Sequence, residues 1–291
     1  MLKSKIKSLR QKGYSYSEIS KQIKKSKKFS WKVAKDIKFD KKGKKRYYNK
    51  VKGILKQIKP QKESLNTSKI RIIGHLLFDG TVFKTQHHYV ARYINSSKEL
   101  INQFILDIKK IYGLEPSSLE TFEGKNKINY YKVTFKSKAL YENLINYFKS
   151  YSTSNQNIKI PDIIMNSNKR IRLEFLRTFF EDEGSISYNY RIMGDLKSRK
   201  IIRQIKDLFK EFDLNFNICR YNQYTGYMYK IYLPKTKENL KRFYNLRFFN
   251  MAIITHGRNI GRKKLEILKD FVKNERQNRS FATCEPLTQT A

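Results

Sequence analysis

One stretch of this 291-residue chain occurs twice, with the same order of apolar, acidic and glycine residues. IRIIGHLLFDGTV at 70–82 matches a later stretch, IRLEFLRTFFEDEGSI, at a constant offset of 104 residues. In this alignment Asp79 falls on Glu183, and Gly80 falls on Gly184. Both copies place an acid and then a glycine after an apolar run, which is typical of the end of a helix.

Two further blocks repeat in the same order. ELINQFILDIKKIYGL at 99–114 matches RKIIRQIKDLFKEFDL at 199–214 at an offset of 100, with apolar residues spaced as on one face of a helix. YKVTF at 131–135 matches YKIYL at 229–233, and both are strand-like. Three blocks in one order make chance a poor explanation, so we expect two copies of one structural unit.

Each copy is predicted to run helix, two strands, helix, two strands, helix. In the first copy the strands are GTVFKTQ, HYVARYIN, SSLETFEG and NYYKVTFK. A twisted antiparallel sheet with helices on one face is the expected α+β layer. The predicted fold is therefore α+β, with two pseudo-symmetric αββαββα repeats whose sheets each leave one face open, preceded by a small all-α unit.

The charge of the chain indicates a polyanionic partner. It carries 63 Lys and Arg against 25 Asp and Glu, a net charge of +38, and residues 1–63 hold 23 of the bases and 4 of the acids. Because the acids do not match the bases, nucleic acid explains the charge better than a generally lysine-rich composition. No run approaches the ~18 apolar residues of a membrane span, and no signal segment is evident. We expect a cytoplasmic protein with no membrane partner.

The N-terminal segment is predicted to contain three short helices. The first covers 4–11 and is ended by Gly13. Ser15 and Glu18 form an S-x-x-E capping box that begins the second, and Ser30 is predicted to cap the third. This arrangement resembles a helix-turn-helix DNA-binding unit. The alternative is a basic helical hairpin that only packs.

The third helix would then enter the major groove, with Lys32 and Lys35 near phosphates or bases. The polar, cationic stretch that follows is expected to lie along a phosphate backbone or to stay mobile. The predicted segments are a helix-turn-helix-like unit at 1–40, a basic linker at 41–63, the first repeat at 64–166, the second repeat at 167–273 and a disordered tail at 274–291.

The repeated motifs themselves resemble a known family. IIGHLLFDG and LRTFFEDEG are similar to the two signature helices of the LAGLIDADG homing endonucleases, in their single-chain, two-repeat form. The resemblance covers roughly 64–273, and its specificity comes from two motifs at matched spacing. The family's helix-contact, acid and terminal glycine positions correspond to Gly74, Asp79 and Gly80 in the first copy and to Thr178, Glu183 and Gly184 in the second.

The chain departs from the family pattern at two positions. An earlier acid is absent from the first copy, where Leu77 stands, and is Glu181 in the second. Phe78 and Asp182 stand where the family usually has a small residue, so we expect the two helices to pack less tightly there.

The residues themselves lead to the same acids. If the repeats pair along these helices, Gly74 and Thr178 allow close approach, and Asp79 and Glu183 meet at two negative helix ends. Like charges so placed need a cation, and oxygen ligands with open positions suit Mg²⁺ or Mn²⁺. Such a metal can support phosphodiester hydrolysis. A single acid before glycine could equally cap a turn. Glu181 and Asp182 are expected behind the metal or facing solvent.

The resemblance also implies that strand residues read base edges in the major groove. Family members often use a lysine near the metals, for which Lys159 and Lys263 are candidates. The candidate DNA-binding residues, all expected on strands that follow or face the signature helices, are Thr85, Arg92, Lys132, Asn189, Arg191 and Lys230.

The resemblance implies a monomeric, intron-encoded endonuclease that cuts both strands of a long DNA target and leaves short 3′ overhangs. Two alternatives share the fold. One is an RNA-binding intron-splicing cofactor, or maturase, with intron RNA as its partner, in which the acids could change without loss. The other is a non-cleaving DNA-binding regulator, which predicts tight, salt-sensitive duplex binding without cutting.

Overall fold

A computed structural model describes residues 2–47, 64–124, 127–187, 189–223 and 226–273. The chain divides into two compact units, Met1–Pro60 and Gln61–Ala291, which are described separately. Within the described ranges, no helix has the length and apolar character needed to cross a membrane. The expected tail at 274–291 and most of the expected linker lie outside the described residues.

The smaller unit contains three helices around a small apolar core. They are α1 (Leu2–Gln11), α2 (Tyr16–Ile23) and α3 (Lys27–Ala34), and their buried core is formed by Ile6, Ile19 and Ala34. The predicted capping box is confirmed, because the Ser15 side chain accepts from the Glu18 backbone N–H and the Glu18 side chain accepts from that of Ser15.

The predicted start of the third helix is wrong by one helical turn. Ser26 is the cap, its hydroxyl accepting from the Phe29 backbone N–H at 3.1 Å, and Ser30 is buried inside the helix. Starting at Ser26 lets Phe29 pack on the core of the unit, which explains why the earlier serine is used. Residues 41–47, expected as linker, are also helical.

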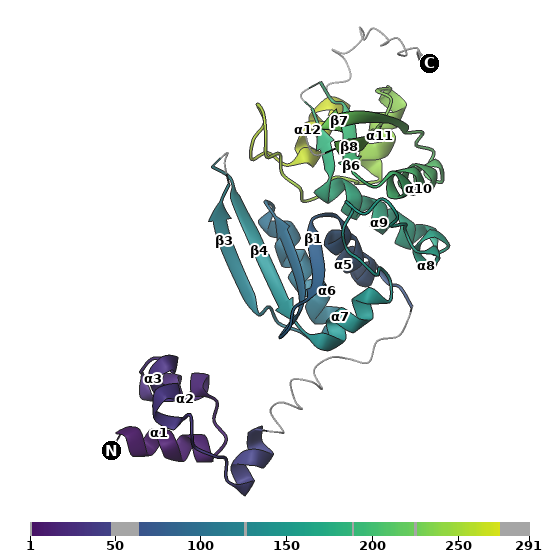
Figure 1. Ribbon diagram of the computed structural model, residues 1–291. Coiled ribbons are helices and arrows are strands. Elements are labelled where there is room, and N and C mark those ends of the chain that lie inside the picture. The colour runs from purple at the N-terminus through teal and green to yellow at the C-terminus, as the bar shows by residue number, and fades with distance from the viewer. Residues whose placement is uncertain (1, 48–63, 125–126, 188, 224–225, 274–291) are drawn as a thin grey trace. The chain divides into compact units, whose positions relative to one another are not determined.

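The larger unit contains the two repeats, and the α+β fold class is confirmed (Figure 1). Their sheets are antiparallel with equivalent strand orders, β1-β2-β4-β3 and β5-β6-β8-β7. The first repeat comprises α5 (Thr67–Phe78), β1 (Gly80–Lys84), β2 (Tyr89–Asn95), α6 (Lys98–Tyr112), β3 (Ser118–Glu123), β4 (Asn129–Lys136) and α7 (Lys138–Ile145). The second comprises α9 (Lys169–Asp182), β5 (Gly184–Ile186), β6 (Ile192–Leu196), α10 (Arg199–Lys210), β7 (Asn217–Gln223), β8 (Gly226–Tyr232) and α11 (Lys237–Asn245). Two further helices are α8 (Asp162–Met165) and α12 (Lys264–Lys273).

Helices α5 and α9 join the two repeats, and they are in close contact at Gly74. A Cβ atom at this position would lie 1.9 Å from Thr178 Oγ1, so only glycine fits. The Thr178 hydroxyl donates to the Phe175 carbonyl at 2.7 Å, which keeps it bonded inside the interface. Small residues at this contact let the two helix backbones approach, as the sequence motifs predicted.

The next turn of the interface is asymmetric. Phe78 packs against Phe175 and Phe179, with ring centroids 5.6 Å and 5.3 Å apart, and is only 7% exposed. It therefore fills the contact, and the expectation of looser packing at this residue is wrong. At the equivalent position of the second repeat, the buried Asp182 carboxylate lies 2.8 Å from His75 Nδ1. One half of the interface is aromatic and the other half is ionic.

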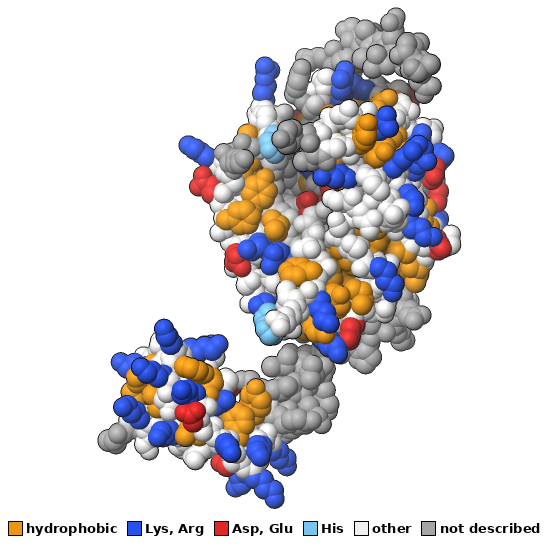
Figure 2. All heavy atoms as spheres, in the orientation of Figure 1, with side chains coloured by type: hydrophobic (Ala, Val, Ile, Leu, Met, Phe, Trp, Pro, Cys, Tyr) orange, Lys and Arg blue, Asp and Glu red, His pale blue; other side chains and the backbone are white. Residues whose placement is uncertain are grey.

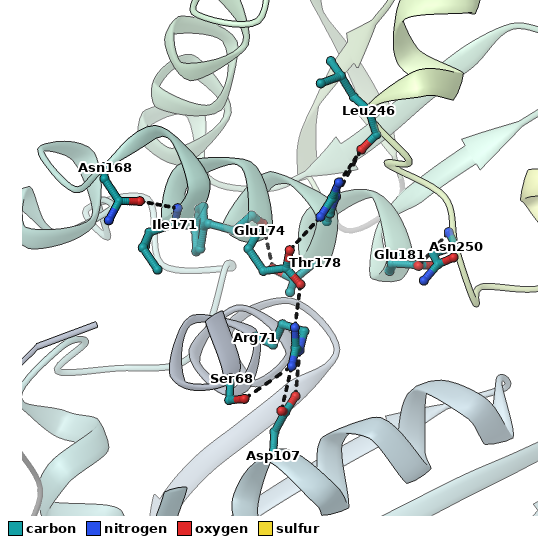
Figure 3. Close-up of polar contacts among 12 residues, drawn as sticks. Ser68, Arg71, Asp107, Asn168, Ile171, Glu174, Thr178, Glu181, Leu246 and Asn250 are labelled. Atoms are coloured by element: carbon teal, nitrogen blue, oxygen red, sulfur yellow. Dashed lines mark hydrogen bonds and ion pairs between the residues drawn. The ribbon is translucent and has the colours of Figure 1, made fainter. Parts of the chain in front are cut away.

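An ionic network also connects the repeats along the side of the helix pair (Figure 3). The Arg71 guanidinium donates to both carboxylate oxygens of Asp107 on α6 at 2.7 Å, and to Glu174 on α9 at 2.8 Å. Glu174 also accepts from Arg177 at 2.9 Å. Paired bonds of this kind fix orientation as well as distance, so the network holds α9 in register with the first repeat.

Replacing Gly74 by alanine is expected to lower the free energy of unfolding by about 1–3 kcal/mol, the usual cost of overpacking a core. Urea unfolding measures the loss. Adding Thr178→Gly, which removes the obstructing side chain, should restore part of it. Strictly additive losses in the double variant would contradict the close approach.

Candidate metal and nucleic-acid site

Asp79 and Glu183 occupy equivalent ends of the paired helices. Each is a C-cap residue, with its backbone N–H donating to the carbonyl of His75 at 3.2 Å or of Phe179 at 2.8 Å. A helix C-terminus carries partial negative charge, so both carboxylates stand where further negative charge is unfavourable. A cavity of about 410 Å³ beside them is lined by Asp79, although not by Glu183.

The electrostatics of the two acids show the strain of this arrangement. Burial raises the pKa of Asp79 from 3.8 to about 7, and repulsion from Asp182 adds to the effect. Burial also raises the pKa of Glu183 well above its usual value, with Asp79 as the largest repelling charge. The negative charges of the two acids therefore repel each other, and a proton or a bound cation reduces this repulsion.

Glu181 has a structural role in the fold. Its carboxylate accepts three backbone N–H groups, those of Asn250, Met251 and Ala252, at 2.7–2.8 Å. The side chain is buried, so the alternative that it faces solvent is wrong, and a place behind the metal stays a prediction. Three bonds to one carboxylate hold the loop after α11 against the end of α9 (Figure 3 shows the bond to Asn250).

The Asp182 carboxylate is also buried, so the alternative that it faces solvent is wrong, and a place behind the metal stays a prediction. It accepts from His75 at 2.8 Å, from the Tyr93 hydroxyl at 2.7 Å and from the Asn95 side-chain amide at 3.2 Å. The same Asn95 amide donates to Asp79 at 3.1 Å and so links the two carboxylates. Burial by itself lowers the pKa of His75, but the Asp182 charge outweighs it and raises the pKa.

The sequence contains a signal that places Asp182 in the helix contact. It is four residues after Thr178, so both lie on the contact face of one helix. Asn95 carries no comparable signal, because its partners come from elements that only the fold brings together. Its side-chain oxygen also accepts the Ser97 backbone N–H at 2.9 Å, which fixes the orientation of the amide.

The structure places a lysine other than the two predicted ones beside the acids. Lys264 is buried, and its ammonium donates to the Gly184 carbonyl at 2.6 Å and to the Glu181 carbonyl at 3.3 Å. Burial lowers the pKa of Lys264, while Glu181, Asp79 and the other acids of the site oppose that change. Lys264 thus lies at the C-terminal end of α9, among the carboxylates.

The two lysines that we predicted lie with other carboxylates. Lys263 pairs with Glu99 on α6 at 2.8 Å, and Lys159 lies 3.8 Å from Asp162. Lys263 is the immediate neighbour of the buried lysine, and a role for either predicted lysine near a metal stays a prediction. No periodic pattern in this segment distinguishes the two positions.

Three of the candidate base-reading residues share the open faces of the sheets. In antiparallel pairs, directly opposed residues lie on the same face. Arg92 is paired with Thr134, Lys132 with Ile94 and Lys230 with Asp195, whereas the buried core residues occupy the alternate positions. Lys132 pairs with Glu120 at 2.6 Å, and Lys230 lies 3.9 Å from Asp195.

The expected place on a strand is wrong for Thr85, Asn189 and Arg191, which lie in the hairpin turns, and the last two candidates belong to the smaller unit. Thr85 follows β1, and its hydroxyl accepts the His88 backbone N–H at 2.9 Å, so it shapes the hairpin turn. Asn189, bonded to the Ser187 hydroxyl, and Arg191 belong to the equivalent turn of the second repeat. Lys32 lies on α3 and Lys35 lies at its end, and both are exposed.

The donor set fits a metal that is shared with a substrate. Among the described residues there is no group of three or more His, Cys, Asp or Glu side chains that could enclose a metal ion. Mg²⁺ commonly takes only one or two carboxylates and fills its other positions with water and phosphate oxygens. Asp79 and Glu183 fit that incomplete type of site.

The raised pKa of Asp79 predicts a pH-dependent effect of metal on stability. Between about pH 4 and pH 7 the folded chain holds a proton that the unfolded chain has lost, so metal-free stability falls as pH rises. Mg²⁺ should bind the charged form and raise the melting temperature more above about pH 7 than below about pH 5. Differential scanning fluorimetry measures both effects. Asp79→Asn should weaken both effects, and a Mg²⁺ gain in this variant that depends on pH as strongly as in the unchanged protein would contradict the assignment.

Comparison with curated proteins gives two distant relatives from Methanocaldococcus jannaschii, and no family model matches the chain. A probable translation initiation factor IF-2 is 24% identical over 198 residues, which are 66% of this chain and 16% of that protein. The uncharacterized protein MJ0314 is 24% identical over 190 residues, which are 61% of this chain and 66% of that protein. The chain thus spans less than two thirds of each relative.

Similar solved structures include homing endonucleases and a LAGLIDADG domain. A mesophilic variant of the homing endonuclease I-DmoI has 14% identity and a TM-score of 0.48, covering 64% of this chain and 98% of its own. The homing endonuclease I-WcaI, bound to its DNA recognition sequence, has 18% identity and a TM-score of 0.47, covering 67% and 85%. The N-terminal LAGLIDADG domain of WhiA has 16% identity and a TM-score of 0.42, covering 63% and 82%. These similar structures are of the kind that the two sequence motifs indicated.

Proposed function

We propose that this chain is a site-specific DNA endonuclease of homing type, which hydrolyses both strands of a duplex in a metal-dependent reaction. The observation that carries the proposal is the pair of half-buried acids, Asp79 and Glu183, at equivalent ends of two helices in contact. A single acid there could be a cap, but two that repel each other require a reason. Short 3′ overhangs follow from the resemblance of the motifs to the family.

Asp79 and Glu183 are the residues that would hold Mg²⁺ or Mn²⁺. When bound, such a metal supplies charge neutralisation at the phosphate and an activated water. Asn95 donates to Asp79 and to Asp182, and so keeps both carboxylates oriented. The Lys264 ammonium, held by the carbonyls of Gly184 and Glu181, lies behind them and would favour the additional negative charge of a phosphodiester in its transition state.

The partner we propose is double-stranded DNA lying along the two open sheet faces. Arg92, Lys132 and Lys230 lie on these faces, in positions where side chains can reach base edges or phosphates. The smaller unit, with Lys32 and Lys35 exposed on and beside α3, would add further contacts to the same duplex. The excess of basic residues over the whole chain favours this partner.

A non-cleaving DNA-binding protein is the second candidate, and one observation favours it. The acids already have protein cations beside them, because His75 pairs with Asp182 and Lys264 lies among the carboxylates. A site neutralised in this way can be stable without metal. Cleavage and binding therefore have to be measured separately.

Asp79→Asn and Glu183→Gln are each expected to lower cleavage by at least about a hundredfold, because each removes a charged ligand while retaining shape. The purified protein is incubated with a random duplex library and Mg²⁺, and new double-strand ends are sequenced. Glu120→Gln, which changes an acid of the open face, is the control and should still produce ends at one sequence. Strong duplex binding without new ends in the unchanged protein would rule out the nuclease.

Lys264→Met is expected to lower the cleavage rate by about 10²–10³-fold, because it removes the buried charge beside the acids and keeps the side-chain length. Lys263→Met is the matched control, since that neighbouring lysine pairs with Glu99. Urea unfolding and duplex binding are measured for both variants. Equal loss of cleavage in the two variants would contradict the role of Lys264.

A further inference from the structure

A basic groove lies on the side of the second sheet that carries the helices. It has a volume of about 620 Å³ and runs between α10 and the edge strand β7. Figure 2 shows lysine and arginine side chains gathered over the region where Figure 1 draws α10. The groove is lined by Arg199, Arg203, Lys206, Asp207, Lys210, Ile218, Cys219, Arg220 and Tyr229.

The cations of α10 form a line. Arg199, Arg203, Lys206 and Lys210 are spaced four, three and four residues apart, which places them on one face of the helix. With a rise of about 1.5 Å per residue, successive charges lie about 4.5–6 Å apart along the helix axis. Arg220, on β7, lines the same groove. The spacing suits a chain of regularly repeated negative charges.

Most of this charge has no acidic partner within the structure. The groove contains one acid, Asp207, and Lys210 pairs with it at 2.8 Å. For Arg199, Arg203 and Lys206 there is no ion pair with a carboxylate among the described residues, and the same holds for the arginine on β7. The groove therefore has several uncompensated positive charges, which attract a polyanion.

Aromatic rings accompany the charges. Tyr229 lines the groove, and the Arg220 guanidinium lies 4.4 Å from the centre of the Tyr227 ring. Grooves that combine positive charge with aromatic side chains are the usual binding sites of single nucleic-acid strands, whose bases can stack. A duplex, whose bases are already stacked, makes no use of such rings.

The first repeat shows that the fold does not require these cations. The offset of 100 residues places Glu99, Gln103, Leu106 and Lys110 of α6 at the positions of the four basic residues of α10. The strand registers place Thr121 at the position of the arginine on β7. The second repeat is basic at all five positions and the first only at Lys110, although both have the same backbone architecture.

The groove is separate from the open face proposed for duplex DNA. Arg220 is paired with Tyr229, whereas Lys230 is paired with Cys219 and Asp195. Neighbouring residues along a strand point to opposite faces. A strand in the groove and a duplex on the open face would therefore occupy opposite sides of the second sheet.

We propose that this groove is a second nucleic-acid site, which binds the phosphodiester backbone of a single strand. The inference goes beyond the proposed cleavage of DNA and does not depend on it. The shared chemistry is the phosphodiester chain, and RNA or unpaired DNA can both supply it. Arg203, Lys206 and Arg220 are the residues assigned to phosphate contacts.

The test compares binding of labelled single strands, one of RNA and one of DNA with the same sequence, and of the matching duplex. Fluorescence anisotropy with the full chain, without divalent metal, gives affinity as a function of salt. Replacing Arg203, Lys206 and Arg220 together by glutamine removes three phosphate contacts. The slope of log affinity against log salt for a single strand should then become less steep by about 2, since each contact contributes about 0.7.

The control variant replaces three exposed lysines outside the groove, Lys149, Lys241 and Lys269, by glutamine. Its net charge equals that of the groove variant. It should keep the single-strand slope, and duplex binding should change little in either variant. A preference for RNA over DNA in the unchanged protein would identify the source of the strand. Equal slopes in the groove variant and the unchanged protein, or equal losses in the control, would overturn the proposal. Because metal is absent, a failed nuclease assay would not affect this result.

Discussion

The close contact between Gly74 and Thr178 determines the rest of the larger unit. With no side chain at Gly74, α5 and α9 approach until the threonine hydroxyl fills the space. Two helices fixed at this contact end together, so Asp79 and Glu183 come to the same place. The sheets that follow each acid then extend from a shared centre. The positions of the acids and of both sheets are therefore consequences of one backbone approach.

The three consecutive acids at the end of α9 show how one helix terminus can serve three purposes. Glu181 binds backbone amides of the following loop, Asp182 pairs with the first repeat, and Glu183 lies beside its equivalent acid. Their unfavourable position at a negative helix end is offset locally by Lys264 and His75. A chain with a large excess of bases can thus maintain a small acidic centre only because particular cations are buried next to it.

Much of this arrangement is readable from the sequence, and the remainder depends on contacts between distant segments. Repetition and helical periodicity predicted that Asp79 and Glu183 end two matching helices, because both signals are local. Ser26 and Ser30 are equally suitable caps by residue type, so the sequence cannot distinguish them. Only the packing of the smaller unit decides for Ser26. The bonds of Asp182 to the first repeat and of Lys264 to the end of α9 are not predictable from the sequence, because these partners belong to elements far away in the chain.

The aromatic half and the ionic half of the α5–α9 interface bear on how the two repeats diverged. Two copies of the second repeat would place each Asp182 opposite a phenylalanine, as two buried carboxylates without hydrogen bonds, at a cost of several kcal/mol per ion. Two copies of the first would place His75 opposite Phe78 and leave the imidazole unpaired. A duplicated gene can begin as two interchangeable halves, but these halves have diverged into obligate complements. Neither repeat alone would form a stable homodimer through this helix interface.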